Sequence, residues 1–210
     1  MVKILLSSRA FINKLITENF INLLGEVNYN QDLIVIIVNS VTEGKTHPKM
    51  IELQKFVNKM GFKKVVLFDV SEDDQAILFS AKAIILNGGY QFILLDNLIK
   101  YGYLKILRNL VYQGKPFYGI SAGAIVLGPD LSLYANLYPE DDLNKDSRTT
   151  AIGATSIRVY PHYDKHSKIN DQLEKNIKNF ELRTNTIISR LDNEQGIFVM
   201  NDQIKLISPY

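Results

Sequence analysis

The chain has 210 residues, 46% of them hydrophobic and 22% charged, and its formal net charge is +2. This composition is typical of an ordinary globular protein, and the length suits one domain, so we expect residues 1–210 to form a single domain with a full core. The weak and dispersed charge argues against a nucleic-acid partner, and no apolar run reaches the ~18 residues that a membrane span requires.

Apolar runs rich in Ile and Val alternate with amphipathic stretches through the first part of the chain, which is typical of βαβ units around a parallel sheet. Strands are expected at residues 2–6, 33–38, 64–68, 83–86 and 116–120. Helices are expected between them at residues 10–24, 47–60, 71–80, 91–101 and 103–113, with Ser71 as an N-cap. The sequence therefore predicts an α/β fold with a mostly parallel sheet.

The last third of the chain is organised differently. Residues 129–150 are polar and are expected to form a loop. Beyond them, strands are expected at 155–159, 186–189, 196–199 and 204–207, with a helix at 168–182. Asn201-Asp202 is typical of a hairpin turn between the last two strands.

Residues 119–123 read Gly-Ile-Ser-Ala-Gly and match the pattern G-x-S-x-G between an apolar strand and a helix of small residues. A sharp strand-to-helix turn of this kind strains the central residue and lifts its side chain clear of the sheet. This context predicts Ser121 as a nucleophile. The alternative is that the small residues only allow close packing, with Ser121 as an ordinary N-cap.

Asn87-Gly88-Gly89 ends another apolar strand. The carboxyl ends of parallel strands meet at one edge of a sheet, so this turn is expected beside Ser121. The N–H groups of Gly88 and Gly89, together with that of Ala122, would then form an oxyanion hole. The alternative is a plain Gly-Gly turn.

A serine nucleophile needs a base, and the chain has three histidines that could serve as one. His162 follows a predicted strand and therefore lies at a strand end, within reach of the same edge. His47 begins a predicted helix and is expected to be a solvent-facing cap, and His166 is expected to be solvated. A metal site at His162 and His166 is disfavoured, since no helix clearly spans the pair and no carboxylate partner is evident. We expect neither a metal nor a cofactor.

An acid that fixes the imidazole tautomer would complete the set. Asp192, Asn193 and Glu194 lie between two late strands, at a turn that can approach His162. The alternative is that these turn residues are only solvated.

Three ordered stretches resemble the dipeptidase E family of serine peptidases, which belongs to the class I glutamine-amidotransferase-like superfamily. They are Asn-Gly-Gly-Tyr-Gln-Phe at 87–92, Tyr-Gly-Ile-Ser-Ala-Gly-Ala at 118–124 and Tyr-Pro-His-Tyr at 160–163. The resemblance covers essentially the whole chain and implies a doubly wound, flavodoxin-like α/β fold with helices on both faces of the sheet. It also implies Ser121 as nucleophile, His162 as base, and the glycine pair with Ala122 as oxyanion hole.

Three positions depart from that family. Tyr90 stands where the family usually has a small Asn, so we expect its ring to shape the substrate site, or else to pack against Phe92 and Leu94. Asn136 replaces a carboxylate often found about fifteen residues after the nucleophile. The third triad member of aspartyl dipeptidase aligns best with Asn193, and we take Glu194 first, with Asn193 and Asp192 as alternatives.

We therefore expect a peptidase that hydrolyses small peptides through an acyl-enzyme on Ser121. An α/β-hydrolase esterase is disfavoured, because no convincing acid lies between Ser121 and His162 in the sequence. The other alternative is a weak or inactive member that serves as a small-ligand binding or regulatory protein. The absence of cysteine excludes thiolate catalysis and suits a reducing compartment, so we expect a cytoplasmic protein. We also expect a monomer or homodimer with no membrane partner.

Overall fold

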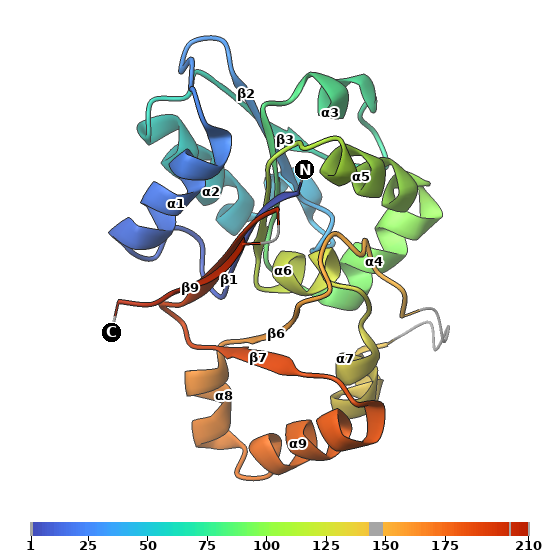
Figure 1. The fold of residues 1–210 in the computed structure, drawn as a ribbon. Helices are drawn as coiled ribbons and strands as arrows, with labels where there is room; N and C mark the ends of the chain where they lie inside the picture. Colours follow the sequence, from blue (N-terminus) through green and yellow to red (C-terminus); the bar gives the residue numbers. More distant parts are fainter. Residues whose placement is uncertain (1, 143–148, 202, 210) are drawn as a thin grey trace.

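The computed structural model describes residues 2–142, 149–201 and 203–209. Within them the main sheet has seven strands in the order β3-β2-β4-β5-β1-β8-β9 (Figure 1). Five of these strands are parallel: β1 Lys3–Ser7, β2 Leu33–Ile37, β3 Lys64–Phe68, β4 Ala83–Leu86 and β5 Phe117–Ile120. The antiparallel hairpin of β8 Gly196–Met200 and β9 Gln203–Ile207 extends one edge. The predicted α/β fold with a mostly parallel sheet is confirmed.

Helices cover both faces of this sheet (Figure 1). One face carries α1 Lys14–Leu24 and α2 Pro48–Lys59. The other carries α3 Ala76–Ser80, α4 Gln91–Lys100, α5 Tyr103–Tyr112 and α6 Ala122–Leu127. Neighbouring residues of a strand point to opposite faces, so β2 sends Ile34 and Ile36 into the core under α1 and α2, and Val35 and Ile37 into the other core. Burial on both faces explains why these strands are continuous apolar runs.

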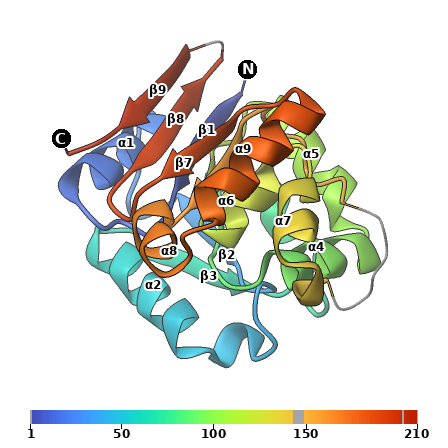
Figure 2. The same ribbon diagram turned by 90° about the horizontal axis from the view of Figure 1, so that it is seen from below.

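A smaller layer lies beyond the carboxyl ends of the parallel strands (Figures 1 and 2). In the described residues it contains a two-stranded parallel sheet of β6 Arg158–Pro161 and β7 Ile188–Leu191. Three helices accompany this sheet: α7 Ser132–Leu137, α8 Tyr163–Ile169 and α9 Leu173–Thr184. Two short 3-10 helices complete the elements, η1 Gly44–Thr46 and η2 Pro139–Asp141. None of the helices formed by the described residues has the length and apolar character needed to cross a membrane.

Several expected elements have different bounds in the structure. The helix expected at 71–80 is formed only from Ala76, because the Ser71 side chain and backbone both bond to Oδ1 of Asp69 instead of capping a helix. The helix expected at 168–182 is α9, which begins only at Leu173, and a separate helix, α8, precedes it at Tyr163–Ile169. The expected loop at 129–150 contains α7 and η2, while its residues 143–148 lie outside the described part.

The hairpin expected at Asn201-Asp202 does join β8 to β9, which pair Met200 with Gln203. Asp202 itself lies outside the described residues. Strands β6 and β7 begin two to three residues later than expected, and they pair with each other rather than with the main sheet.

Candidate active site

Ser121 occupies the turn between β5 and α6 with φ +49° and ψ −111°. A positive φ is uncommon for a residue with a side chain and is typical of strained functional positions. The flanking glycine Gly123 is required by close packing, since a Cβ there would lie 2.0 Å from the carbonyl oxygen of Leu86. The Ser121 side chain makes no N-cap hydrogen bond, so the interpretation of Ser121 as an ordinary cap is wrong.

His162 follows β6 directly, in the left-handed conformation with φ +59°. Its Nε2 lies 3.0 Å from Oγ of Ser121. The buried Ser8, which follows β1 of the main sheet, holds the turn at His162 in place. Its Oγ accepts the His162 backbone N–H at 3.1 Å and donates to the Leu191 carbonyl at 3.0 Å. The structure thus brings together the serine and the histidine that the sequence singled out.

The side chain beside the other ring nitrogen is that of Asn193, whose Oδ1 lies 2.7 Å from Nδ1 of His162. Glu194, the first candidate from the sequence, is exposed in the turn between β7 and β8, where its carbonyl oxygen accepts a bond from Asn13. The preference for Glu194 is therefore corrected to Asn193. The turn after β7 points one side chain at the imidazole, and that side chain belongs to Asn193.

Asn193 is in turn bonded to Asp164, a residue that the sequence analysis did not select. The Asn193 Nδ2 lies 2.9 and 3.0 Å from the two carboxylate oxygens of Asp164, and the Asn193 backbone N–H donates to Oδ1 at 2.9 Å. Asp164 lies in the first turn of α8, two residues after the histidine. Its place two residues after the candidate base His162 was the one available signal in the sequence.

The glycine turn after β4 does lie beside the serine, because a Cβ on Gly88 would be 3.2 Å from Cβ of Ser121. The Gly88 N–H already donates to Oδ1 of Asn87 at 2.7 Å, which argues against Gly88 as an oxyanion donor. Gly89 has φ +155°, and a Cβ there would lie 2.4 Å from the carbonyl oxygen of Ser40. Ala122 is the first residue of α6, where backbone N–H groups lack intrahelical partners.

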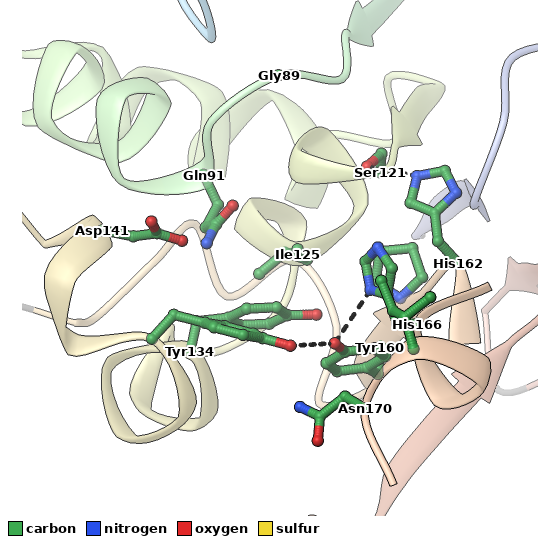
Figure 3. Close-up of a pocket in the computed structure, with 13 residues that line it drawn as sticks. Gly89, Gln91, Ser121, Ile125, Tyr134, Asp141, Tyr160, His162, His166 and Asn170 are labelled. Atoms are coloured by element: carbon green, nitrogen blue, oxygen red, sulfur yellow. Dashed lines mark hydrogen bonds between the residues drawn. The ribbon is translucent and has the colours of Figure 1, made fainter. Parts of the chain in front are cut away.

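Two pockets meet at Ser121, and each includes Gly89 and His162. The first, which we call the tyrosine pocket, has a volume of about 610 Å³ (Figure 3). Its wall is formed by the side chains of Tyr134, Tyr138, Tyr160, Gln91, Asp141 and His166. The second, which we call the Tyr90 pocket, has a volume of about 640 Å³. Its polar and aromatic lining includes Arg9, His47, Lys49, Glu52, Phe56 and Tyr90.

Hydrogen bonds join the side chains of the tyrosine pocket (Figure 3). The Tyr160 hydroxyl bonds to that of Tyr138 and lies 3.1 Å from Nδ1 of His166. Burial raises the pKa of the Tyr160 hydroxyl well above its ordinary value, so this group stays protonated. Burial also lowers the pKa of His166, and the nearby His162 lowers it further. The expectation of a solvated His166 is wrong, because its ring is half-buried against Tyr160.

The remaining candidates lie as follows. His47 caps α2, with its Nδ1 accepting the Lys49 N–H at 3.2 Å, as expected for a cap residue. Tyr90 is 62% exposed, so the alternative in which it packs beneath the helix is wrong. Asn136 is exposed on α7. Among the described residues, no three His, Cys, Asp or Glu side chains gather as metal ligands do.

Known proteins resemble this chain in sequence. The family model for peptidase family S51 matches residues 4–207. An uncharacterized peptidase of Pasteurella multocida (strain Pm70) is 24% identical over 152 residues, which cover 72% of this chain and 70% of that protein. Peptidase E of Shewanella sp. (strain ANA-3) is 29% identical over 94 residues, 45% of this chain and only 38% of that protein.

Two crystal structures share the fold. The protein described as "Putative Peptidase E Protein" from Listeria monocytogenes EGD-e superimposes with a TM-score of 0.79 at 19% identity, over 100% of both chains. A peptidase from an acI-B1 Actinobacterium gives a TM-score of 0.69 at 17% identity, over 99% of this chain and 88% of that one. The doubly wound α/β architecture expected from the sequence is thereby confirmed.

Proposed function

The chain belongs to peptidase family S51, and we propose that it hydrolyses small peptides through an acyl-enzyme on Ser121. The predicted resemblance to the dipeptidase E family is confirmed by this membership and by relatives named Peptidase E. The observation that carries the proposal is the 3.0 Å separation between Oγ of Ser121 and Nε2 of His162. A hydroxyl within hydrogen-bond reach of an oriented imidazole is the arrangement that activates a serine nucleophile.

In the proposed reaction, Oγ of Ser121 attacks the peptide carbonyl carbon while Nε2 of His162 takes the hydroxyl proton. The negative charge that develops on the carbonyl oxygen is held by the N–H groups of Gly89 and Ala122. The imidazolium then gives its proton to the leaving amine as the peptide bond breaks. A water molecule, deprotonated by His162, attacks the acyl-enzyme. The bond between the acyl carbon and Oγ then breaks, the acid leaves, and Oγ of Ser121 takes the proton back from the imidazolium.

The two pockets support a short peptide as substrate, because the scissile bond would lie over Ser121 with one side of the peptide in each pocket. Both volumes lie in the range of small-molecule sites, about 300–1,000 Å³. Arg9 and Lys49 in the Tyr90 pocket suit a free peptide carboxylate, whereas Asp141 in the tyrosine pocket suits a free ammonium group. We therefore propose peptides with both termini free.

A second candidate function is a small-ligand binding or regulatory protein with weak catalysis. The neutral Asn193 favours it, since Asn has no charge with which to stabilise an imidazolium. The same two pockets would then bind a peptide without turning it over.

Labelling with a fluorophosphonate separates the two candidates. An active serine is expected to form a covalent adduct that mass spectrometry places on Ser121, and the adduct should be lost in Ser121→Ala and in His162→Ala. Ser80→Ala, which changes an exposed serine on α3, is the matched control and should label as the wild type does. A screen of short peptides with varied N-terminal residues then identifies the substrate. Peptide binding without any adduct would overturn the hydrolase proposal.

A further inference from the structure

The side-chain amide of Asn193 lies between two groups with different hydrogen-bonding requirements. Its Oδ1 faces Nδ1 of His162 at 2.7 Å, and its Nδ2 faces the carboxylate of Asp164 at 2.9 and 3.0 Å. An amide has an acceptor end and a donor end of nearly the same shape, so its orientation is decided only by its neighbours. A carboxylate accepts hydrogen bonds and donates none when ionised. The donor end of Asn193 must therefore face Asp164.

This orientation decides the protonation of the histidine ring. With Oδ1 of Asn193 facing the ring, Nδ1 of His162 carries the hydrogen and Nε2 keeps its lone pair toward Ser121. A reversed amide would present an N–H group to Nδ1 and place the hydrogen on Nε2. The histidine would then be unable to take the Ser121 proton.

We propose that Asp164 is a positioning residue that acts through Asn193 to hold His162 in the tautomer with hydrogen on Nδ1 and a free lone pair on Nε2. The inference rests on the proposed function for its catalytic meaning, but the tautomer itself is independent of any activity.

The backbone makes the arrangement a fixed one. His162 and Asp164 belong to one short segment, since His162 follows β6 in a left-handed conformation and Asp164 lies in the first turn of α8. Asp164 also accepts the backbone N–H of Asn193 at 2.9 Å, so both the main chain and the side chain of Asn193 bond to the same carboxylate. Bonds to a charged acceptor are roughly twice as strong as neutral ones.

The test uses three variants and one control. Asp164→Asn keeps the size of the side chain, but an amide can both donate and accept hydrogen bonds. Residue 164 then no longer requires a donor from Asn193, and either orientation of the Asn193 amide can be accommodated. Asn193→Asp gives the histidine an acceptor that has no wrong orientation, but it also places a second carboxylate against that of Asp164. In the double variant Asp164→Asn/Asn193→Asp, the amide and the carboxylate exchange places and the contact can form again. Asp171→Asn removes an exposed carboxylate between α8 and α9 and serves as the control.

Nitrogen-15 NMR of the His162 ring reports the tautomer directly, and the rate of fluorophosphonate labelling reports the reactivity of Ser121. We expect Asp164→Asn to show a mixture of tautomers and a labelling rate lower by at least about tenfold, the size of loss that follows when the outer partners of metal-binding histidines are removed. The double variant should regain the single tautomer and most of the rate, and Asp171→Asn should match the wild type. Thermal melts of all variants identify any loss that comes from folding alone.

The outcomes separate this inference from the proposed function. A single unchanged tautomer in Asp164→Asn, or a double variant no better than Asp164→Asn, would overturn the positioning role. A tautomer change in a protein that never labels would support the role of Asp164 and overturn the hydrolase proposal instead. If Asp164→Asn does not fold, the role is judged from Asp164→Ser, whose hydroxyl can donate or accept and therefore fits either orientation of Asn193. A mixture of His162 tautomers in that variant supports the role, and a single unchanged tautomer counts against it.

Discussion

The hydroxyl oxygen of Ser8 lies 3.1 Å from the backbone nitrogen of His162, so a residue that follows β1 holds the residue that follows β6. Ser8 is 1% exposed, and its hydroxyl also donates to the carbonyl of Leu191 at the end of β7. One buried hydroxyl therefore connects the main sheet to both strands of the smaller sheet.

We predict that Ser8→Ala lowers both stability and turnover. The substitution leaves the part-buried N–H of His162 and the buried carbonyl of Leu191 without this partner, which costs about 1–3 kcal/mol of unfolding free energy. A displaced imidazole should also lower kcat by up to about 100-fold. The matched control is Ser7→Ala, a buried serine whose hydroxyl bonds to Arg9 and Tyr118 rather than to the smaller sheet. Equal kcat values in the two variants would contradict the prediction.

The strained backbone of Ser121 predicts a gain in stability when the residue becomes glycine. Such a conformation costs about 1–3 kcal/mol for a residue with a Cβ, and glycine avoids this cost at an entropic penalty of about 0.5–1 kcal/mol. Both Ser121→Gly and Ser121→Ala should lose on the order of 10⁴–10⁶ in kcat with the nucleophile. In thermal melts the glycine variant should be the more stable of the two. An alanine variant as stable as the glycine variant would show that the turn is unstrained.

Tyr90→Asn is expected to change which peptides are cleaved more than it changes stability. The ring is 62% exposed in the pocket that bears its name, so its loss should alter the unfolding free energy by about 0.5 kcal/mol or less. Phe92→Ala, two residues away and 5% exposed, is the contrast and should cost about 3–5 kcal/mol. The measurements are a peptide screen and a chemical denaturation curve. An unchanged substrate profile with a large loss of stability would make Tyr90 structural.

Acidification should destabilise the protein in part through His166. Burial lowers the pKa of this ring in the folded state, whereas in the unfolded state the pKa is near its ordinary value of about 6.5. The unfolded state therefore takes up a proton first as the pH falls. The contribution of His166 to the stability of the folded state is complete above about pH 6.5, and it is lost as the pH falls through the lower pKa of the folded state. Denaturation curves of wild type and His166→Gln between pH 8 and pH 5 should converge toward the acid end, and parallel curves would contradict this.

The sequence was sufficient for the strands of the main sheet. Strands β2 and β4 are buried on both faces, so their residues form uninterrupted apolar runs bounded by polar turns. Helix α1 shows the limit at element ends. Its apolar spacing begins at Phe11, but Phe11 has φ +44° and the helix starts only after Asn13, whose side chain caps Ile16. Periodicity reports which side chains are buried, and it does not report where the backbone begins to turn.

In the candidate site, Ser121 and His162 could be found because each directly follows a strand and carries distinctive chemistry. The sequence could not decide among Asp192, Asn193 and Glu194. Neighbouring turn residues point in different directions, and only the path of the chain between β7 and β8 determines which of them faces His162. The tyrosine pocket was missed for a related reason. Tyr134 and Tyr138 lie in a stretch whose polar composition conceals α7, and they meet Tyr160 only through the tertiary fold.

The division of the proposed catalytic groups between the two sheets has an evolutionary consequence. The proposed nucleophile and oxyanion donors follow strands of the main sheet, whereas the histidine, its amide neighbour and the carboxylate behind it all lie within residues 158–196. A substitution at Asn193 can therefore be compensated inside the same segment, without any change near Ser121. We expect a chimera that exchanges this segment with a family member to inherit that member's proton-transfer residues as a unit, while the substrate-facing turns after β4 and β5 keep the character of the recipient.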